Sequence, residues 1–302
     1  MKRNLRSTLI ALPLAALLVL AGCSSSDPLA TEKPENGDTK SLVIGSQDYY
    51  SNEIIAEIYA QSLEAQGYAV DRQFRIGQRE IYVPEIEAGS IDLFPEYSGP
   101  LLQYWDADSD ALLAKDVYTE LAVAAPEGLR ILAQSPATDQ DSYVVTKEFA
   151  DQWGLETIAD LSKVTTGLTL GANSEAESRP NGPKGLLDVY GVTAAFTPIE
   201  DGGGPLTIKA LKDNAIQLAI IYSADPSVSN EGLVSLKDTK GLFLASHVVP
   251  IASDNVDEKA TEIINEVSSA MTAQDLVEMN ARSVNEQLPA KTIAADWLKQ
   301  LG

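Results

Sequence analysis

The order of short apolar runs and helical segments that follows residue 40 is the feature that most constrains the fold. Residues 41–46 and 68–74 are typical of short strands, and the alternation of apolar and polar side chains over 90–93 predicts a third strand. Between these runs, residues 51–67 and 77–89 carry apolar side chains at helical spacing and close on glycine. A strand–helix–strand–helix–strand order predicts an α/β fold with a parallel sheet and right-handed crossovers.

The third predicted strand ends in a short motif that places a tyrosine at its carboxyl end. Pro95 has no N–H to donate to a sheet, and residues 98–100 (Ser-Gly-Pro) indicate a tight turn. Tyr97 therefore lies where open α/β sheets bind ligands. Its ring could stack on a cation or an apolar group, or simply pack over the turn.

The remainder of the chain continues the mixed pattern. Strands are expected at 130–133, 142–146, 168–172, 196–200, 217–222, 233–236 and 246–252, and helices at 101–129 with a break at 106–110, at 157–161, 183–190 and 257–281, and from 289 to 301. Ser51 is the expected N-cap of the first helix. The roughly 260 residues after position 40 are enough for one large α/β domain or two smaller ones.

The N-terminal residues have the pattern of an export signal. Lys2, Arg3 and Arg6 precede an apolar run over 9–20, which is too short to span a bilayer comfortably. Residues 20–23 (Leu-Ala-Gly-Cys) then resemble the lipobox of bacterial lipoproteins. This resemblance implies a signal peptide over 1–22 and an acylated Cys23, followed by a polar tether over 23–40. An ordinary secretory signal with an incidental cysteine is the alternative.

Composition narrows the classes of function. With 44 acidic and 22 basic residues the formal net charge is −22, which argues against nucleic acid and is compatible with a cationic ligand or a merely soluble acidic surface. Cys23 is the only cysteine, so an internal disulfide framework and a cysteine-rich metal centre are excluded. His247 is the only histidine, and no Gly-x-Ser-x-Gly motif is present. We expect neither catalytic residues, nor a metal, nor a cofactor.

A glycine run over 201–205 is the remaining candidate for cofactor chemistry. It lacks the Gly-Lys-Ser/Thr ending of a phosphate-binding loop and the spacing of a dinucleotide site. A permissive turn with Pro205 at a helix start is the better interpretation.

Tyrosines recur at or just after predicted strand ends. Tyr97, Tyr143 and Tyr222 share this position, with Asp141 and Asp225 close to two of them. Tyrosine rings with a nearby carboxylate suit a quaternary ammonium, which cannot donate strong hydrogen bonds and is held by ring quadrupoles, each contact contributing roughly 0.5–2 kcal/mol.

One arginine complements these tyrosines. Arg179, in the loop after another predicted strand, could bind a carboxylate with its planar fork.

Several motifs together resemble one family, the substrate-binding proteins of ABC importers for glycine betaine, choline and related osmoprotectants. The matching segments are Leu-Val-Ile-Gly-Ser-Gln (42–47), Glu-Ile-Tyr-Ala-Gln (57–61), Gly-Gln-Arg-Glu-Ile (77–81), Gly-Ser-Ile-Asp-Leu-Phe-Pro-Glu-Tyr-Ser-Gly (89–99), Arg-Pro-Asn-Gly-Pro-Lys-Gly-Leu (179–186), Gly-Gly-Pro-Leu-Thr (203–207) and Tyr-Ser-Ala-Asp-Pro (222–226).

The resemblance implies a periplasmic-binding-protein type II fold, in which two α/β lobes close on a ligand about a hinge. The first lobe would comprise 41–144 with 248–302, the second 145–247, and the chain would cross near Tyr143 and near His247. Tyr97, Tyr143 and Tyr222 would form an aromatic cage with Asp141 beside it, and Arg179 would bind the ligand carboxylate.

Three positions depart from the family pattern. Gln47 stands where some members have a lysine that binds the ligand carboxylate, and Pro100 replaces a threonine whose hydroxyl does the same. Ser246 stands where many members have a further cage tyrosine. These departures allow weak betaine binding, a different zwitterion or a bulkier cation.

The expectation is therefore an extracytoplasmic, lipid-anchored binding protein rather than an enzyme. It would capture glycine betaine, choline or a related solute and deliver it to a permease with its ATPase. An amino-acid-like polar solute in the same fold is the alternative. A cell-surface hydrolase and an adhesin or sensor subunit are the rival classes.

Overall fold

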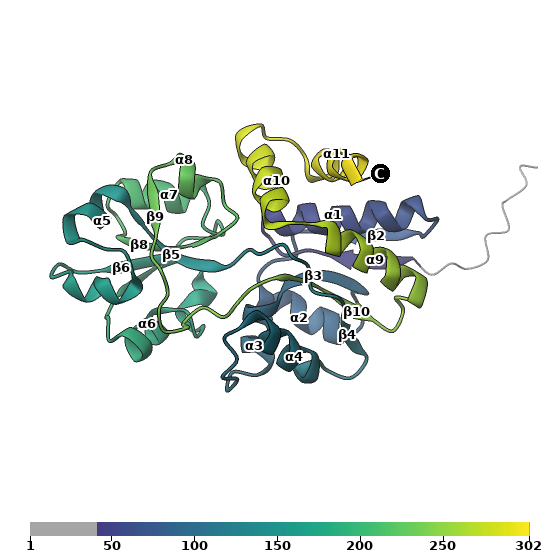
Figure 1. Cartoon of the computed structure of the whole chain (residues 1–302), viewed down its shortest axis with the longest axis horizontal. Coiled ribbons are helices and arrows are strands. Elements are labelled where there is room, and N and C mark those ends of the chain that lie inside the picture. The colour runs from purple at the N-terminus through teal and green to yellow at the C-terminus, as the bar shows by residue number, and fades with distance from the viewer. Residues whose placement is uncertain (1–40, 302) are drawn as a thin grey trace, which may run out of the picture. The chain divides into compact units, whose positions relative to one another are not determined.

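Two five-stranded sheets organise residues 41–301, the part of the chain that a computed structural model describes (Figure 1). The first sheet has the order β2-β1-β3-β10-β4, with β1 (Leu42–Gly45), β2 (Val70–Gln73), β3 (Leu93–Tyr97), β4 (Leu129–Ile131) and β10 (Val248–Ser253). The second has the order β7-β6-β8-β5-β9, with β5 (Asp141–Thr146), β6 (Thr169–Ala172), β7 (Ala195–Pro198), β8 (Leu218–Tyr222) and β9 (Leu233–Ser235). The α/β class expected from the sequence is confirmed.

Both sheets are parallel over three strands and antiparallel beyond. β1 pairs in parallel with β2 and β3, as the strand–helix order predicts. β10 then pairs antiparallel with both β3 and β4. In the second sheet β6 is parallel to β7 and β8, whereas β5 is antiparallel to β8 and β9. The antiparallel strands β5 and β10 each follow a segment that crosses from one sheet to the other. Local sequence periodicity does not predict these crossings.

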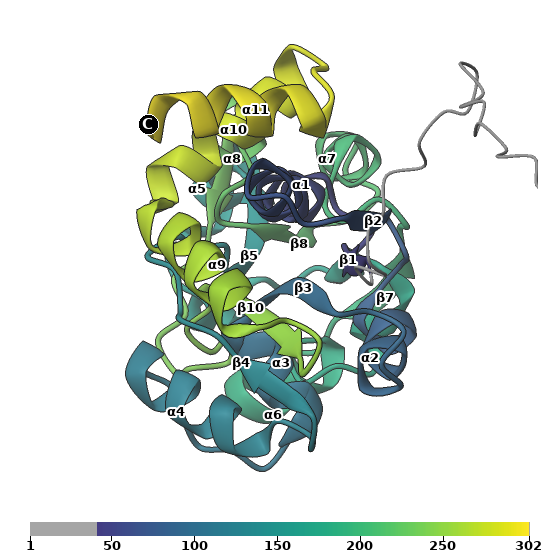
Figure 2. The ribbon, with the colours of Figure 1, turned by 90° about the vertical axis from the view of Figure 1, so that its right-hand side faces the viewer.

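Seven helices accompany the first sheet within the described residues. They are α1 (Tyr50–Ala65), α2 (Arg79–Glu87), α3 (Ser98–Trp105), α4 (Ala114–Ala124), α9 (Glu258–Ala270), α10 (Ala273–Asn285) and α11 (Ala290–Leu301). Helix α1 contacts α9, α10 and α11, which gather beside it in Figure 2. Its fully buried Ile54, Ile58 and Leu63 join Ile44 of β1 in one core.

The second sheet has its own core and shorter helices. These are α5 (Lys147–Trp153), η1 (Ile158–Lys163), η2 (Ser174–Glu177), α6 (Pro183–Tyr190), α7 (Pro205–Lys212) and α8 (Ser227–Asn230). Leu170 of β6, Leu218 of β8 and Leu186 of α6 are fully buried together. The predicted helix over 183–190 matches α6, which Pro183 begins and Gly191 ends with a φ of +70°.

Three local expectations differ from the structure. Tyr49, not Ser51, is the N-cap of α1, and Ser51 is buried within the helix. The helix expected over 257–281 is divided, because Thr272 caps a new helix through a capping box with Asp275. A similar box between Thr157 and Asp160 begins a 3₁₀ helix rather than an α-helix.

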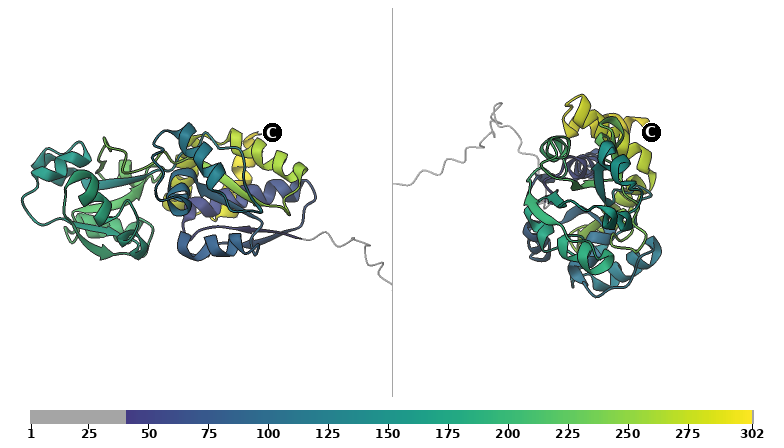
Figure 3. Two further views of the ribbon diagram at one scale, coloured as in Figure 1. Left: turned by 90° about the horizontal axis from the view of Figure 1, so that it is seen from below. Right: turned by 90° about the vertical axis from the view of Figure 1, so that its left-hand side faces the viewer.

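The chain crosses between the sheets twice, through residues 132–140 and 236–247 (Figure 3). The two crossing segments meet at an antiparallel bridge between Thr138 and His247, where the N–H of Val248 donates to the oxygen of Ala137 at 3.0 Å. The first expected lobe boundary, at residue 144, falls inside β5. Sheet pairing places residues 141–144 with the second lobe, whereas the boundary at 248 coincides with the start of β10.

Candidate ligand-binding site

A polar pocket forms beside the carboxyl ends of β1 and β3. On its other side lie the first residue of β5 and the last residue of β8, which pair with each other. Ten residues line it: Gln47, Tyr49, Gln78, Arg79, Tyr97, Pro100, Asp139, Asp141, Arg179 and Tyr222. They come from both sheets, so the pocket depends on contacts between segments far apart in the chain. Five of them, Gln47, Tyr97, Asp141, Arg179 and Tyr222, are residues that the sequence predicted as ligand-binding.

Three tyrosine rings form the aromatic part of the pocket. Tyr97 is the last residue of β3 and Tyr222 the last of β8, as the strand-end pattern predicted. Tyr49, which sequence reasoning missed, lies between β1 and α1, and its ring centroid is 4.6 Å from that of Tyr222. The signal that identified Tyr97 also applies to Tyr49, because it too follows a strand. Burial raises the pKa of all three phenols, so the rings stay neutral.

Tyr143 does not line this pocket, although it was predicted as a cage residue. Its side chain is fully buried in the core of the second sheet, edge-on to Phe243, and its hydroxyl donates to the oxygen of Asn181 at 2.8 Å. Asp141 lies on the same face of β5, two residues nearer the pocket, and accepts a hydrogen bond from Nδ2 of Asn181 at 2.6 Å. The loop that carries Asn181 therefore separates Tyr143 from the pocket.

Two carboxylates supply negative charge at the pocket. Asp141 is the predicted one, and burial raises its pKa despite the opposing charge of Arg179. Asp139, which was not predicted, is 3% exposed; its Oδ1 accepts from the N–H of Ala224 at 2.9 Å. Burial, with the charges of Asp141 and Asp225 adding to it, raises the pKa of Asp139 to about 7.

Arg179 lies at the pocket, but the Nε/Nη2 edge of its guanidinium is already occupied. Its Nε and Nη2 donate to the two carboxylate oxygens of Glu80 on α2, at 3.0 and 2.8 Å. Nη2 also lies 3.4 Å from Oε1 of Gln78. Burial opposes the charge of Arg179, but the hydrogen bonds to Glu80 raise its pKa overall.

Several buried polar atoms of the pocket have no hydrogen-bond partner among the described residues. They are Nε2 of Gln47, the hydroxyls of Tyr49 and Tyr97, and Oδ2 of Asp139. A buried polar group without a partner costs about 1–3 kcal/mol. Four such atoms in one pocket indicate that it is built to meet the polar groups of a ligand.

Ser246 contributes to the edge of the site rather than to its aromatic wall. Its hydroxyl donates to the oxygen of Asp139 at 3.1 Å, and it lines a small neighbouring pocket with Pro100, Asp141 and Phe243. The serine therefore holds the crossing segment that carries Asp139.

The pocket is nearly filled by its own side chains in this structure. Its cavity volume is about 20 Å³, room for little more than one water molecule. The rings of Tyr49 and Tyr222 touch where a ligand would lie between them. A ligand larger than water would therefore have to separate these rings or the segments that carry them.

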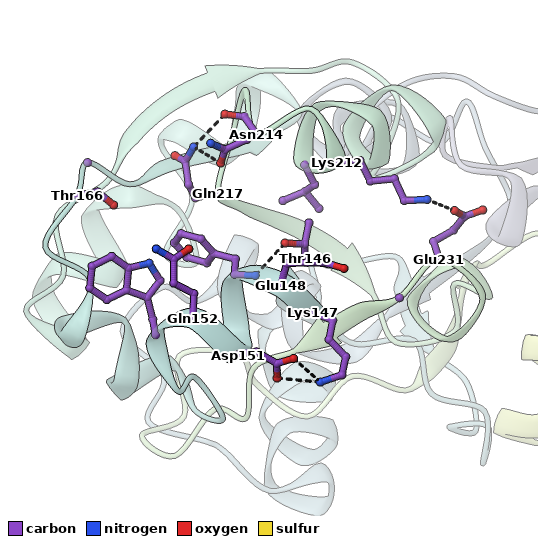
Figure 4. Close-up of a pocket in the computed structure, with 15 residues that line it drawn as sticks. Thr146, Lys147, Glu148, Asp151, Gln152, Thr166, Lys212, Asn214, Gln217 and Glu231 are labelled. Atoms are coloured by element: carbon purple, nitrogen blue, oxygen red, sulfur yellow. Dashed lines mark hydrogen bonds and ion pairs between the residues drawn. The ribbon is translucent and has the colours of Figure 1, made fainter.

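A larger groove, of about 1010 Å³, lies on the second sheet beside α5 and α7 (Figure 4). Four of its five charged side chains form ion pairs, Lys147 with Asp151 and Lys212 with Glu231, and the fifth, Glu148, is exposed. The groove is also lined by Phe149 and Trp153, whose ring centroids are 6.5 Å apart, but no buried unpaired carboxylate accompanies them among the described residues.

The candidates that the sequence offered for other chemistry are a metal site, His247 and Cys23. No group of three or more histidine, cysteine, aspartate or glutamate side chains within 41–301 is arranged to hold a metal ion. His247 belongs to the crossing segment, where its Nδ1 lies 2.9 Å from the oxygen of Ser135. Cys23, the predicted lipidation site, lies outside the described residues.

Comparison with known proteins identifies a family. Residues 40–300 match the family described as the substrate-binding domain of the ABC-type glycine betaine transport system. The glycine betaine-binding protein YehZ of Escherichia coli (strain K12) is 26% identical over 302 residues, which cover 95% of this chain and 96% of that protein.

A second relative and a solved structure extend the comparison. The ergothioneine transport permease/ergothioneine binding protein EgtU of Helicobacter pylori (strain G27) is 22% identical over 89% of this chain and 49% of its own length. A solved structure titled as a glycine betaine/carnitine/choline ABC transporter has a TM-score of 0.68 at 20% identity, over 86% of this chain and 98% of that one. The fold of that structure agrees with the expected periplasmic-binding-protein type II class.

Proposed function

This chain belongs to the family of substrate-binding domains of ABC-type glycine betaine transport systems, and we propose that its tyrosine pocket captures a quaternary ammonium solute. Proteins of this family are extracytoplasmic binding proteins, not enzymes, and they act with permease and ATPase partners. The ligand class proposed for this chain is glycine betaine, choline or a related trimethylammonium compound. An amino-acid-like polar solute is the alternative.

One observation carries the proposal: three neutral tyrosines surround a pocket that also holds the carboxyl groups of the buried Asp139 and the half-buried Asp141. Tyr49, Tyr97 and Tyr222 offer ring faces, to which a desolvated cation is attracted by about 2 kcal/mol or more. Asp139 and Asp141 offer the compensating negative charge. A solute without a cationic group would leave that charge unbalanced, so the pocket favours a ligand with a positive charge.

The predicted membrane attachment is part of the proposal. No helix among residues 41–301 is long and apolar enough to cross a membrane. We propose that acyl chains on Cys23 anchor the protein and that residues 23–40 tether the binding domain.

Calorimetric titration with paired ligands tests the proposed class. Choline and 3,3-dimethyl-1-butanol have nearly the same shape, but the second has a neutral tert-butyl group. We expect choline to bind, and its neutral analogue to bind at least about tenfold more weakly because it gains neither ring attraction nor charge pairing. Equal affinities, or failure of choline, glycine betaine, carnitine, proline betaine and ergothioneine all to bind at millimolar concentration, would contradict the proposal.

A further inference from the structure

The ion pair between Arg179 and Glu80 joins residues that lie 99 positions apart in the chain. Glu80 comes from the first turn of α2, and Arg179 from the loop between η2 and α6. The contact is bidentate, with both carboxylate oxygens bound, which is the geometry in which an arginine best recognises a carboxylate. Glu80 thus fills the position that a carboxylate of a bound ligand would need.

No other cation is free at the pocket within the described residues. Arg79, the second arginine that lines it, forms a buried ion pair with Glu96, at 2.6 Å between Nε and Oε1. Gln47 is neutral and offers only an amide. Glu96 and Glu80 already balance the two arginines of the lining, whereas neither Asp139 nor Asp141 forms an ion pair within the described residues, so the pocket attracts a cation more than it attracts a carboxylate.

We propose that Glu80 determines ligand specificity: by occupying Arg179 it makes the site prefer quaternary ammonium compounds with a neutral tail over those with a carboxylate. This inference rests on the proposed function. A betaine carboxylate could take the bidentate Nε/Nη2 edge of the guanidinium only by displacing Glu80. At Nη1 it would meet a guanidinium whose charge Glu80 already balances, and the two carboxylates would repel each other.

The unpartnered polar atoms suit a neutral tail. Nε2 of Gln47 donates, and the hydroxyls of Tyr49 and Tyr97 donate or accept, so a ligand alcohol could be bound without any formal charge. The preferred class is therefore a trimethylammonium alcohol of the choline type.

The test measures the ratio of two affinities. Choline and glycine betaine are titrated into the full chain and into Glu80→Gln. With Arg179 released, we expect glycine betaine to bind about tenfold more tightly than it binds the parent protein, and the ratio to move toward glycine betaine by at least that factor. Glu85→Gln is the matched control, because Glu85 is exposed on the same helix and has no ion-pair partner among the described residues.

A double-mutant cycle separates release of Arg179 from the loss of one negative charge. Arg179→Gln alone should change glycine betaine affinity little, because Glu80 already balances the charge of the guanidinium. In the Arg179→Gln background, Glu80→Gln should no longer improve glycine betaine binding. Any effect of the pair on the approach of the two sheets acts on both ligands and cancels in the ratio.

The outcomes are distinct. An unchanged ratio in Glu80→Gln, or a large loss of glycine betaine affinity in Arg179→Gln alone, overturns the inference while leaving the proposed function intact. Failure of both ligands to bind the parent protein overturns the proposed function and this inference with it.

Discussion

The rings of Tyr49 and Tyr222 pack against each other with centroids 4.6 Å apart and an interplanar angle of 48°. Tyr49 precedes α1 beside the first sheet, and Tyr222 ends β8 of the second. Each ring therefore shields the other from water at the place where a cation would be bound. In the proposed complex a cation would replace this ring–ring contact with two ring–cation contacts, so binding would require these two residues to separate.

The first prediction concerns the ring of Tyr222. Tyr222→Ala removes one cation–π contact, and choline affinity should fall by roughly 2- to 30-fold, corresponding to about 0.5–2 kcal/mol. Tyr222→Phe keeps the ring and should retain most of the affinity, because the hydroxyl of Tyr222 has no hydrogen-bond partner among the described residues. Calorimetry measures both. Equal losses in the two variants would show that the hydroxyl, not the ring, binds the ligand.

The second prediction is that cation binding strengthens as pH rises. The pKa of Asp139 is raised to about 7 by burial, so its ionised fraction climbs from about one tenth at pH 6 to about nine tenths at pH 8. Choline affinity should rise by up to about ninefold over this interval. Asp139→Asn should flatten the profile. A profile that is as steep in the variant as in the parent protein would assign the effect to another group, such as Asp141, whose pKa is also raised.

The third prediction concerns stability and the same carboxyl group. In the folded protein the pKa of Asp139 is about 7, above its unfolded value of about 3.9, so between these pH values the folded state holds a proton that the unfolded state has lost. Its contribution to the free energy of unfolding therefore falls as pH rises from about 4 to 7. Urea denaturation of the ligand-free protein should show Asp139→Asn gaining stability relative to the parent between pH 4.5 and 7.5. A constant difference would contradict the raised pKa.

The fourth prediction concerns the buried pair behind the pocket. Glu96 is fully buried and accepts from Arg79, the hydroxyl of Tyr82 and the N–H of Tyr97. Arg79→Met leaves this carboxylate without its counter-charge and should lower the free energy of unfolding by about 3–5 kcal/mol. The matched control is Lys147→Met, which breaks the exposed pair with Asp151 and should change stability by less than about 1 kcal/mol.

The fifth prediction concerns Cys23. Cys23→Ala removes the only thiol that could be acylated, so the protein should leave the membrane fraction when expressed in a bacterial host. Choline affinity, measured on the released protein, should equal that of the parent binding domain. Membrane retention of the variant would contradict lipid anchoring at this residue.

Sequence periodicity accounts for most of the elements. Strands alternate every second residue and helices repeat every 3.6, so β1, β3 and α6 follow from the local pattern alone. The same pattern placed Tyr97 and Tyr222 at strand ends, where the pocket forms. The same pattern also predicted Tyr143 as a pocket residue. It does not distinguish a side chain at the pocket end of β5 from one buried further along the strand.

Tertiary structure decided the rest. Asp139 becomes a pocket residue only because the crossing segment passes beside Ala224. The N–H of Ala224, 85 positions away in the chain, donates a hydrogen bond to the Asp139 carboxylate. Glu80 pairs with Arg179 across 99 positions of the chain, a contact that local sequence patterns cannot predict. Sequence by itself determined the α/β fold and the aromatic, acidic character of the site, because these depend on residue type and local period. Only the tertiary structure decided which charged side chains of the pocket have no ion-pair partner, because ion pairing depends on distance in space.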